Sequence, residues 1–425
     1  MKKTALVAAI ALAVGCLFPD VSSLDGDGGA DAGAPEGGDA SALPGIANAG
    51  HVSTATGNAT QTHVVWAIGA KRWWLFYVDD DPSTLKTRSS ADFATWTDGP
   101  SLTLGHPNGG EGRNFTVAYA SLGGSDVIHV SFSHAGDGGP LIHSHTRGVI
   151  SGSTIQWGLP VDIAQIAKPA DGPDGPASFI DVDGTVWDAT GFVASAGTNG
   201  NGYENQDVFV AAAKDDGVSW TTSFTQTTIE VVDTAVRSRI FLDTGGLGAT
   251  WSGGEHDPNP LNLHFSLFSG SWQSAYSIFD QDAAQDANDW DAARYVTPTS
   301  VVEGHVVRAR LDGVYEHAWG TGGSGQNGAA PPTQSRIAGT GVVLLADPMH
   351  LAAFDVAGTG ELVTSRWDGA AWSAWSTVAP PAPRSLLSGY CPDLSAHPEA
   401  GGCAILWTSP WNGGFVVDGV LVQTH

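Results

Sequence analysis

Tryptophan recurs along this sequence at intervals that suit one kind of fold. Five tryptophans each follow a cluster of short β-like runs, and the intervals between them are 61, 63, 52 and 100 residues. They are Trp96, Trp157, Trp220, Trp272 and Trp372. A period near 50 residues that holds about four strands is typical of β-propeller blades. A single blade leaves both faces of its sheet exposed, so blades must stack around an axis to bury them.

The runs between these tryptophans predict an all-β chain. They are rich in β-branched and aromatic residues, as in 73–78, 126–132 and 414–422, and they end in Gly, Asp, Asn or Pro. The best helical candidate is 280–290. Five tryptophan-marked units, a degenerate unit at 292–336 and the tail from 384 predict a propeller with seven blades over residues 46–425. Six blades remain if the 100-residue interval is one blade with an insertion.

The N-terminus has the pattern of an export signal. Two lysines precede an apolar run at 4–14, which is too short to span a bilayer. The run ends in Ala-Val-Gly-Cys16, which resembles the lipobox of bacterial lipoproteins. The resemblance implies a signal peptide at 1–15, lipidation of Cys16 and a place in the outer membrane, on the periplasmic side or at the cell surface. An ordinary signal peptide is the alternative. Residues 16–45, rich in Gly, Asp and Ala, predict a disordered linker.

The net charge restricts the partners that the chain can bind, and the cysteines predict a disulfide. The net charge of −26 opposes binding to nucleic acid, so the only membrane or polymer contacts expected are the lipid anchor and carbohydrate. Beyond Cys16 the chain holds Cys391 and Cys403, which predict one disulfide in an oxidising compartment, worth about 3 kcal/mol. The pair His143 and His145 has strand spacing but no evident third ligand, so neither a metal nor a cofactor is expected.

One segment matches a known repeat. Ala213-Lys-Asp215-Asp-Gly217-Val-Ser-Trp220 resembles the Asp-box of sialidase-type propellers. Segments 89–96 and 366–372 look like looser relatives. The resemblance implies a hairpin tip in which the Asp side chain accepts bonds from turn amides and the Trp packs between blades.

Arginines stand near the start of several predicted first strands. They are Arg113, Arg237, Arg239, Arg294 and Arg384. Guanidinium groups match carboxylates in two-point geometry. Sialidases use an arginine cluster on their substrate, so the resemblance implies an anionic glycan as partner. Local pairing with Glu111, Asp233 or Asp291 is the other interpretation.

Carboxyl groups and tyrosines in polar segments are candidates for catalysis. They are Glu111, Asp174, Glu204, Glu255 and Tyr295, with Tyr203 as an alternative nucleophile. Glycosidases need two carboxyl groups, or a Tyr paired with a Glu. A lyase would instead use His256, His264 and Tyr276. The Arg-Ile-Pro signature of sialidases is absent, and its nearest echo is Arg239-Ile-Phe.

These features predict a cell-surface propeller that engages carbohydrate. A sialidase-like glycosidase or a polysaccharide lyase acting on anionic glycans is the catalytic form. The alternative is a non-catalytic lectin-like or adhesion propeller, favoured by the three tryptophans of segment 366–375. The sequence leaves open whether the chain is an enzyme.

Overall fold

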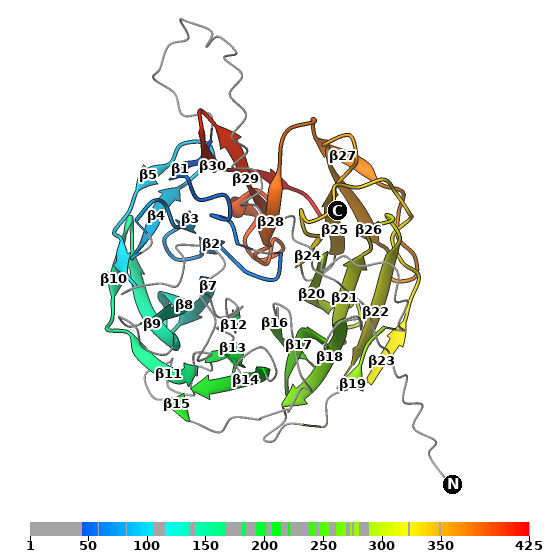
Figure 1. The fold of residues 1–425 in the computed structure, drawn as a ribbon, viewed down its shortest axis with the longest axis horizontal. Helices are drawn as coiled ribbons and strands as arrows, with labels where there is room; N and C mark the ends of the chain where they lie inside the picture. The colour runs from blue at the N-terminus through cyan, green and yellow to red at the C-terminus, as the bar shows by residue number, and fades with distance from the viewer. Residues whose placement is uncertain are drawn as a thin grey trace, which may run out of the picture.

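The computed structural model describes residues 45–424 except for these positions and segments: 58, 82, 105–114, 136–140, 167–180, 184–192, 201–205, 214–219, 222–237, 244–245, 255–260, 269–272, 274–275, 280–288, 322–323 and 348–349. The described strands form seven antiparallel sheets around a common centre, which is the arrangement of a β-propeller (Figure 1).

The first four sheets follow one another along the chain. The first contains β2 (Val64–Ala67), β3 (Arg72–Tyr77), β4 (Thr84–Ser90), β5 (Thr97–Asp98) and β6 (Leu102–Thr103). The second contains β7 (Phe115–Leu122), β8 (Ser125–Ala135), β9 (Leu141–Ser151), β10 (Thr154–Trp157) and β11 (Val161–Ile166). The third contains β12 (Asp181–Asp183), β13 (Val193–Gly200), β14 (Gln206–Ala213) and β15 (Trp220–Thr221). The fourth contains β16 (Ser238–Asp243), β17 (Gly246–Gly254), β18 (Leu261–Phe268) and β19 (Tyr276–Ser277).

The last three sheets complete the ring. The fifth contains β20 (Asp289–Val296), β21 (Val302–Ala309), β22 (Tyr315–Thr321) and β23 (Ser324–Asn327). The sixth contains β24 (Val343–Asp347), β25 (His350–Val356), β26 (Leu362–Trp367) and β27 (Ser376–Ala379). The seventh contains β28 (Ser385–Tyr390), β29 (Cys403–Trp411), β30 (Gly414–Val422) and, from the other end of the described chain, β1 (Ala47–Gly50).

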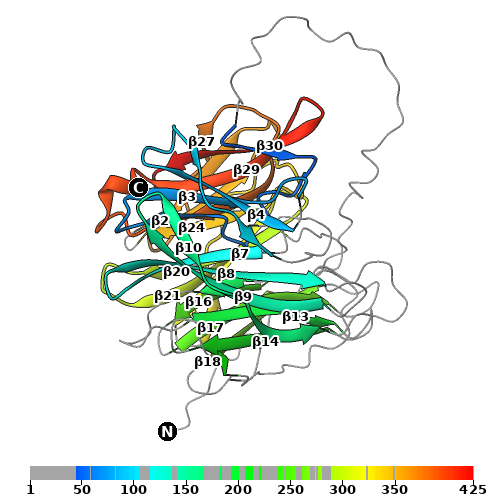
Figure 2. The ribbon, with the colours of Figure 1, turned by 90° about the vertical axis from the view of Figure 1, so that its left-hand side faces the viewer.

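The first strand of each sheet lies nearest the centre, and Figure 2 shows the same ring from the side. Apolar side chains on both faces of the sheets fill the spaces between neighbours. One core cluster, for example, joins Val65 and Trp74 of the first sheet to Val117 and Val130 of the second. Burial of both sheet faces explains why these strands read as nearly continuous apolar runs.

Strand β1 closes the ring. Ala47 pairs with Val417 and Asn48 with Val416, so the start of the described chain forms the outer edge of the sheet made by its end. The seventh sheet is therefore built from residues that are about 370 positions apart in the sequence.

The segment that connects β1 to β2, residues 51–63, lies at the centre of the ring; we call it the central segment. Its hydrogen bonds reach the first strands of three sheets: Thr62 with Thr116 of β7, Thr60 with Arg239 of β16, and Gln61 with Ser388 of β28. Ala55, Thr56 and residues 59–63 are all buried. The middle of the propeller is thus occupied by backbone and small polar side chains.

The recurring tryptophans pack between sheets, as the sequence predicts. Trp96 packs against the core shared by the seventh and first sheets. Trp157 packs against the core of the first and second, and Trp372 lies in that of the fifth and sixth. Each of these three indoles therefore contacts the sheet that precedes its own. The side chains of Trp220 and Trp272 lie outside the described residues.

Two hairpin tips have the aspartate turn that the looser Asp-box relatives predict. Between β4 and β5, Asp92 Oδ1 accepts hydrogen bonds from the amides of Ala94 (2.9 Å) and Thr95 (2.7 Å). The Thr95 and Ala94 amides lower the pKa of Asp92 to about 2. Between β26 and β27, Asp368 accepts bonds from two turn amides in the same way. Asp215 and Gly217, which belong to the best sequence match, lie outside the described residues.

Other sequence predictions have clear outcomes. Cys391 and Cys403 form the predicted disulfide. The one helical element among the described residues is a short 3-10 turn, Pro398–Ala400. Of the helical candidate 280–290, Asp289 and Trp290 belong to β20, and the rest lies outside the described residues. No helix in the described part of the chain is long and apolar enough to cross a membrane.

Candidate functional site

A pocket of about 360 Å³ lies between the fifth and sixth sheets. We call it the interblade pocket. The fifth sheet contributes the end of β20, the turn after it, the start of β21 and one residue of β22: Tyr295, Thr297, Pro298, Glu303 and Trp319. The sixth sheet contributes the start of β25, the end of β26 and the hairpin tip that follows: His350, Trp367, Asp368 and Gly369. The volume is within the range of about 300–1,000 Å³ found for small-molecule sites.

Strand register places four side chains of the fifth sheet on one face. Tyr295 of β20 pairs directly with Glu303 of β21, and His305 of β21 pairs with Trp319 of β22. Directly paired residues, and residues two apart on one strand, share a face of a sheet. This face is the one that packs against the sixth sheet, which supplies Trp367.

A stacked histidine pair lies beneath the pocket. The rings of His305 and His317 are 5.1 Å apart and nearly parallel, and the Trp319 ring stacks on His305 at 6.0 Å. The distance from His305 Nδ1 to His317 Nε2 is 2.9 Å, and from His305 Nε2 to Glu303 Oε2 it is 3.0 Å. The two imidazoles therefore connect the interior of the sheet pair to the carboxyl group of the pocket.

The hydrogen-bond roles in this chain depend on which ring nitrogens carry protons. An ionised Glu303 accepts a bond from Nε2–H of His305. Nδ1 of His317 lies 2.9 Å from the carbonyl oxygen of Ala329, which can only accept, and 3.2 Å from the indole nitrogen of Trp372, which can only donate. Burial lowers the pKa of His305 below its usual value and that of His317 to about 3, so both rings are neutral. The bond from His305 fixes the orientation of the Glu303 carboxyl group.

The second sheet contains the same histidine pair with different residues around it. His129 of β8 and His145 of β9 have the register of His305 and His317, and their rings stack at 5.3 Å. At the positions of Tyr295 and Glu303 the second sheet has Ala120 and Val127, which also pair directly. The histidine pair is therefore a repeated structural element, and the pocket residues are particular to the fifth sheet.

The electrostatic field in the pocket is negative. Burial raises the pKa of the Tyr295 hydroxyl, and the charges of Glu303 and Asp347 raise it further. Asp368 is exposed, and its bonds from the Ala371 and Ala370 amides lower its pKa, which keeps it ionised. Tyr295 consequently remains a neutral phenol at neutral pH.

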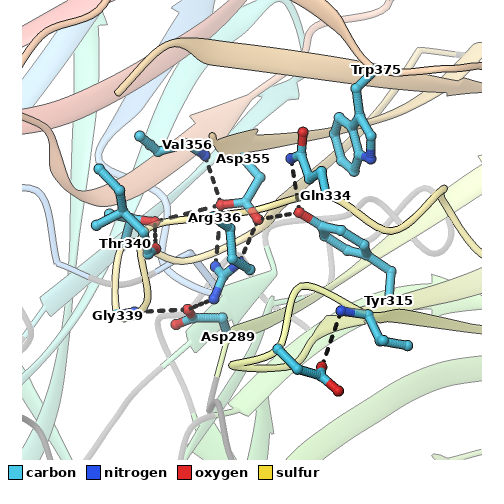
Figure 3. A network of polar contacts seen from close by, with 12 residues as sticks. Asp289, Tyr315, Gln334, Arg336, Gly339, Thr340, Asp355, Val356 and Trp375 are labelled. Carbon is cyan, nitrogen blue, oxygen red and sulfur yellow. Dashed lines mark hydrogen bonds and ion pairs between the residues drawn. The ribbon is translucent and has the colours of Figure 1, made fainter. Parts of the chain in front are cut away.

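A buried polar network holds the two pocket-forming sheets together (Figure 3). The guanidinium of Arg336, in the connection from β23 to β24, has no exposed surface. It lies 2.7 Å from Asp289 of β20 and 2.7 Å from Asp355 of β25. The hydroxyl of Tyr315 donates to Asp355 at 2.7 Å, and Gln334 donates to Tyr315. Burial disfavours the charge of Arg336, but the two carboxylates outweigh it and raise its pKa.

Two arginines of the predicted clamp, Arg239 and Arg384, are engaged in structural contacts. Arg239 donates to the backbone of Ala292 and of Thr60, and it lies 3.6 Å from the buried Asp291. Arg384 donates to two backbone oxygens in the connections around the sixth sheet and stacks on Trp407 at 4.6 Å. Local pairing, which was the other interpretation, therefore describes Arg239.

The remaining predicted binding residues separate into two groups. Arg294 of β20 is exposed and does not line the interblade pocket. Arg113 and Arg237 lie outside the described residues, so their part in a clamp stays a prediction. The structure does not bring Arg239 or Arg384 to the interblade pocket either.

Of the predicted catalytic residues, the structure places Tyr295 in the pocket. The others lie outside the described residues, as do the lipidation site and two alternatives weighed above: Glu111, Asp174, Glu204, Glu255, Cys16, Tyr203 and His256. His264 is on β18, and burial lowers its pKa to about 4. Tyr276 is on β19. His145 of the strand-spaced histidine pair bonds to His129.

Sequence reasoning missed Glu303, Trp319 and His350. Trp319 lies outside the five-tryptophan pattern, because its indole is on the third strand of its sheet and not at the hairpin tip. Glu303 and His350 stand at strand starts in polar surroundings that resemble many surface turns. A usable signal was the step of two residues from His317 to Trp319, which parallels that from His145 to Arg147.

A second hollow, of about 590 Å³, lies beside β1 and β4, and its lining includes four aspartates. Its acids already have partners. Asp80 accepts a bond from the amide of His51, Asp81 from Ser83, and Asp98 pairs with Arg88 at 2.9 Å. We assign it no role.

Comparisons with known proteins give only distant likenesses. No protein-family model matches the chain, and no curated protein matches it. Among solved structures, a variant of the Aleuria aurantia lectin in complex with Fucα1-6GlcNAc is 13% identical, with 77% of this chain and 99% of the lectin covered and a TM-score of 0.47. Trypanosoma rangeli sialidase in complex with sialic acid is 12% identical, with 86% of this chain and 54% of the sialidase covered and a TM-score of 0.45. At these values the likenesses carry no argument about residues or ligands.

Proposed function

We propose that this protein is a carbohydrate-binding propeller of seven blades, one for each described sheet, and that the interblade pocket is its binding site. One observation carries the proposal: two indoles, Trp319 and Trp367, line the same pocket as the carboxyl group of Glu303. Aromatic faces bind the apolar C–H face of a sugar ring, and a fixed carboxylate accepts bonds from its hydroxyls. The buried ring of His305 holds that carboxylate in place.

The proposed activity is binding without turnover. A sialidase-like reaction is favoured by one feature, the direct pairing of Tyr295 with Glu303. The raised pKa of Tyr295 opposes it, because a phenol that holds its proton is a poor nucleophile. The described residues that line the pocket also include no arginine to bind a substrate carboxylate. Binding of an anionic glycan would therefore depend on Arg113 and Arg237.

The position of the protein in the cell is proposed from the sequence. A lipidated Cys16 and the linker 16–45 would display the propeller from the outer membrane, on the periplasmic side or at the cell surface. The Asp-box relationship to sialidase-type propellers is likewise proposed, supported by the aspartate turns at Asp92 and Asp368. A glycan-binding module displayed in this way suits adhesion or capture of polysaccharide.

The test is a glycan array followed by calorimetric titration of the best ligand. We expect Trp319→Ala to weaken binding by up to about tenfold, since stacked aromatic contacts contribute about 0.5–1.5 kcal/mol beyond their buried area. Trp319→Phe keeps an aromatic face and should retain part of the affinity. The matched control is Trp411→Ala, which removes an exposed indole from the seventh sheet, 42% exposed and outside the pocket.

Two results would contradict the proposal. One is equal affinity of the Trp319→Ala variant and the unmodified protein. The other is release of sugar from any bound glycan, detected as new reducing ends, that Tyr295→Phe abolishes. The latter would restore the glycosidase alternative.

A further inference from the structure

The charge of the interblade pocket restricts its ligand. Two of its lining residues are carboxylic acids, Glu303 and Asp368, and the described lining residues include neither Lys nor Arg. The other lining residue that could carry a positive charge is His350. Its Nδ1 lies 3.0 Å from Oδ1 of Asp347, so the carboxylate of Asp347 would offset that charge. A ligand with its own carboxylate would enter a field of like charge, whereas a cation would be attracted.

Glu303 is arranged to bind a donor from the ligand. Its Oε2 accepts from His305, and its side chain is 13% exposed, so the carboxyl group is only partly screened by water. Within the described part of the structure, Oε1 has no hydrogen-bond partner. Two buried neutral imidazoles stand behind the carboxylate and carry no charge that would neutralise it. An incoming ammonium group could therefore make a charge-assisted hydrogen bond.

The aromatic walls favour the same kind of group. Trp319 and Trp367 line the pocket beside Glu303, with the ring of Tyr295 from the facing strand. The face of an indole attracts a cation within about 6 Å and also packs on the apolar face of a pyranose. Aromatic faces combined with carboxylates suit a ligand that has an apolar ring face and a positive charge together.

We propose that the ligand of the interblade pocket is an amino sugar with a free, protonated amine, its ammonium group on Glu303 and its ring against the two indoles. This inference rests on the proposed carbohydrate function and deepens it. It predicts that free hexosamines bind more tightly than their N-acetyl forms, which lack the charge, and than uronic acids, which carry the opposite charge.

The experiment compares matched glucosamine and galactosamine oligosaccharides, each in the free-amine and the N-acetylated form, with oligogalacturonate as the anionic probe. Titrations at pH 7 and low salt should give at least about tenfold tighter binding of a free-amine form than of its N-acetylated partner. This preference should shrink as salt is raised. Oligogalacturonate should bind more weakly than either.

A charge-neutral variant tests the assigned contact. Glu303→Gln keeps the shape of the side chain and should lower the affinity for the free amine by about tenfold, with little change for the N-acetylated form. Glu361→Gln, which removes one negative charge from a hairpin of the sixth sheet outside the pocket, should change neither.

The outcomes distinguish the two proposals. If N-acetylated or neutral sugars bind as tightly as free amines, and Trp319→Ala abolishes that binding, the amino-sugar inference is overturned and the carbohydrate function stands. If free amines bind better but Glu303→Gln leaves the preference unchanged, the contact is wrongly assigned and the inference fails. If no sugar binds, both proposals fail.

Discussion

Arg336 allows a sharp test of how the fifth and sixth sheets are held together. Its guanidinium is fully buried between Asp289 and Asp355, with contacts of 2.7 Å to each and a further bond of 3.2 Å to Asp355. Arg336→Ala removes the only cation that the described structure places between these two carboxylates and leaves both of them buried. Breaking a buried ion pair by removing one partner costs about 3–5 kcal/mol, so we expect the free energy of unfolding to fall by about that amount.

The assay is equilibrium denaturation followed by tryptophan fluorescence. The matched control is Arg366→Ala on β26 of the sixth sheet. This arginine is exposed and donates one long bond of 3.5 Å to Gln423. The control should lose no more than about 0.5 kcal/mol. A loss below about 1 kcal/mol for Arg336→Ala would refute the reasoning, since it would mean that the two carboxylates do not depend on the arginine.

The pH dependence adds a second check on the same variant. Burial raises the pKa of Asp355, and Arg336 opposes that rise. Without the arginine the pKa rises further, so the folded variant keeps a proton that the unfolded chain releases above pH about 4. The stability of the variant therefore falls as pH increases through this range, and its deficit against the unmodified protein should shrink between pH 7 and pH 5. A deficit that is constant over that range would contradict this account.

Three further predictions concern stability. Burial raises the pKa of Asp291 to about 7, so its contribution to stability should decline as pH rises from about 4 to 7, by at most about 1.4 kcal/mol per pH unit, and Asp291→Asn should remove that slope in pH-dependent unfolding. Replacing Cys391 and Cys403 by serine should lower the free energy of unfolding by about 3 kcal/mol, measured against the oxidised protein. Gly313→Ala would place a Cβ 1.8 Å from the backbone oxygen of Gln334 and should lower the melting temperature well beyond Gly124→Ala, where φ is also positive but nothing lies within 4 Å.

The propeller fold could be predicted because tryptophans that pack between sheets recur along the sequence. Trp96, Trp157 and Trp372 mark where their sheets contact the preceding ones, so a packing requirement repeats along the sequence. The long interval between Trp272 and Trp372 contains the fifth sheet and most of the sixth, so it spans two units as its length suggests. The fifth sheet escaped the pattern because Trp319 lies on its third strand and contacts His305.

The candidate site could be predicted only in part, because strand register decides which side chains meet. Tyr295 was a candidate as an isolated tyrosine, but its pairing with Glu303 depends on the hairpin between β20 and β21. The position of residues 51–63 could not be predicted from the sequence. These small polar residues read as a loop, and only the closed ring shows that they occupy the centre.

The pairing of β1 with β30 has a consequence for the order of folding. Residues 47–50 are made about 370 positions before their partners at 415–417. Until then the early strand has an unsatisfied backbone edge, and residues 51–63 lack their contacts with Ser388. The ring must therefore stay open at one place until β30 has been made. Strands β28 to β30 close the ring, and losing them would release both of its ends.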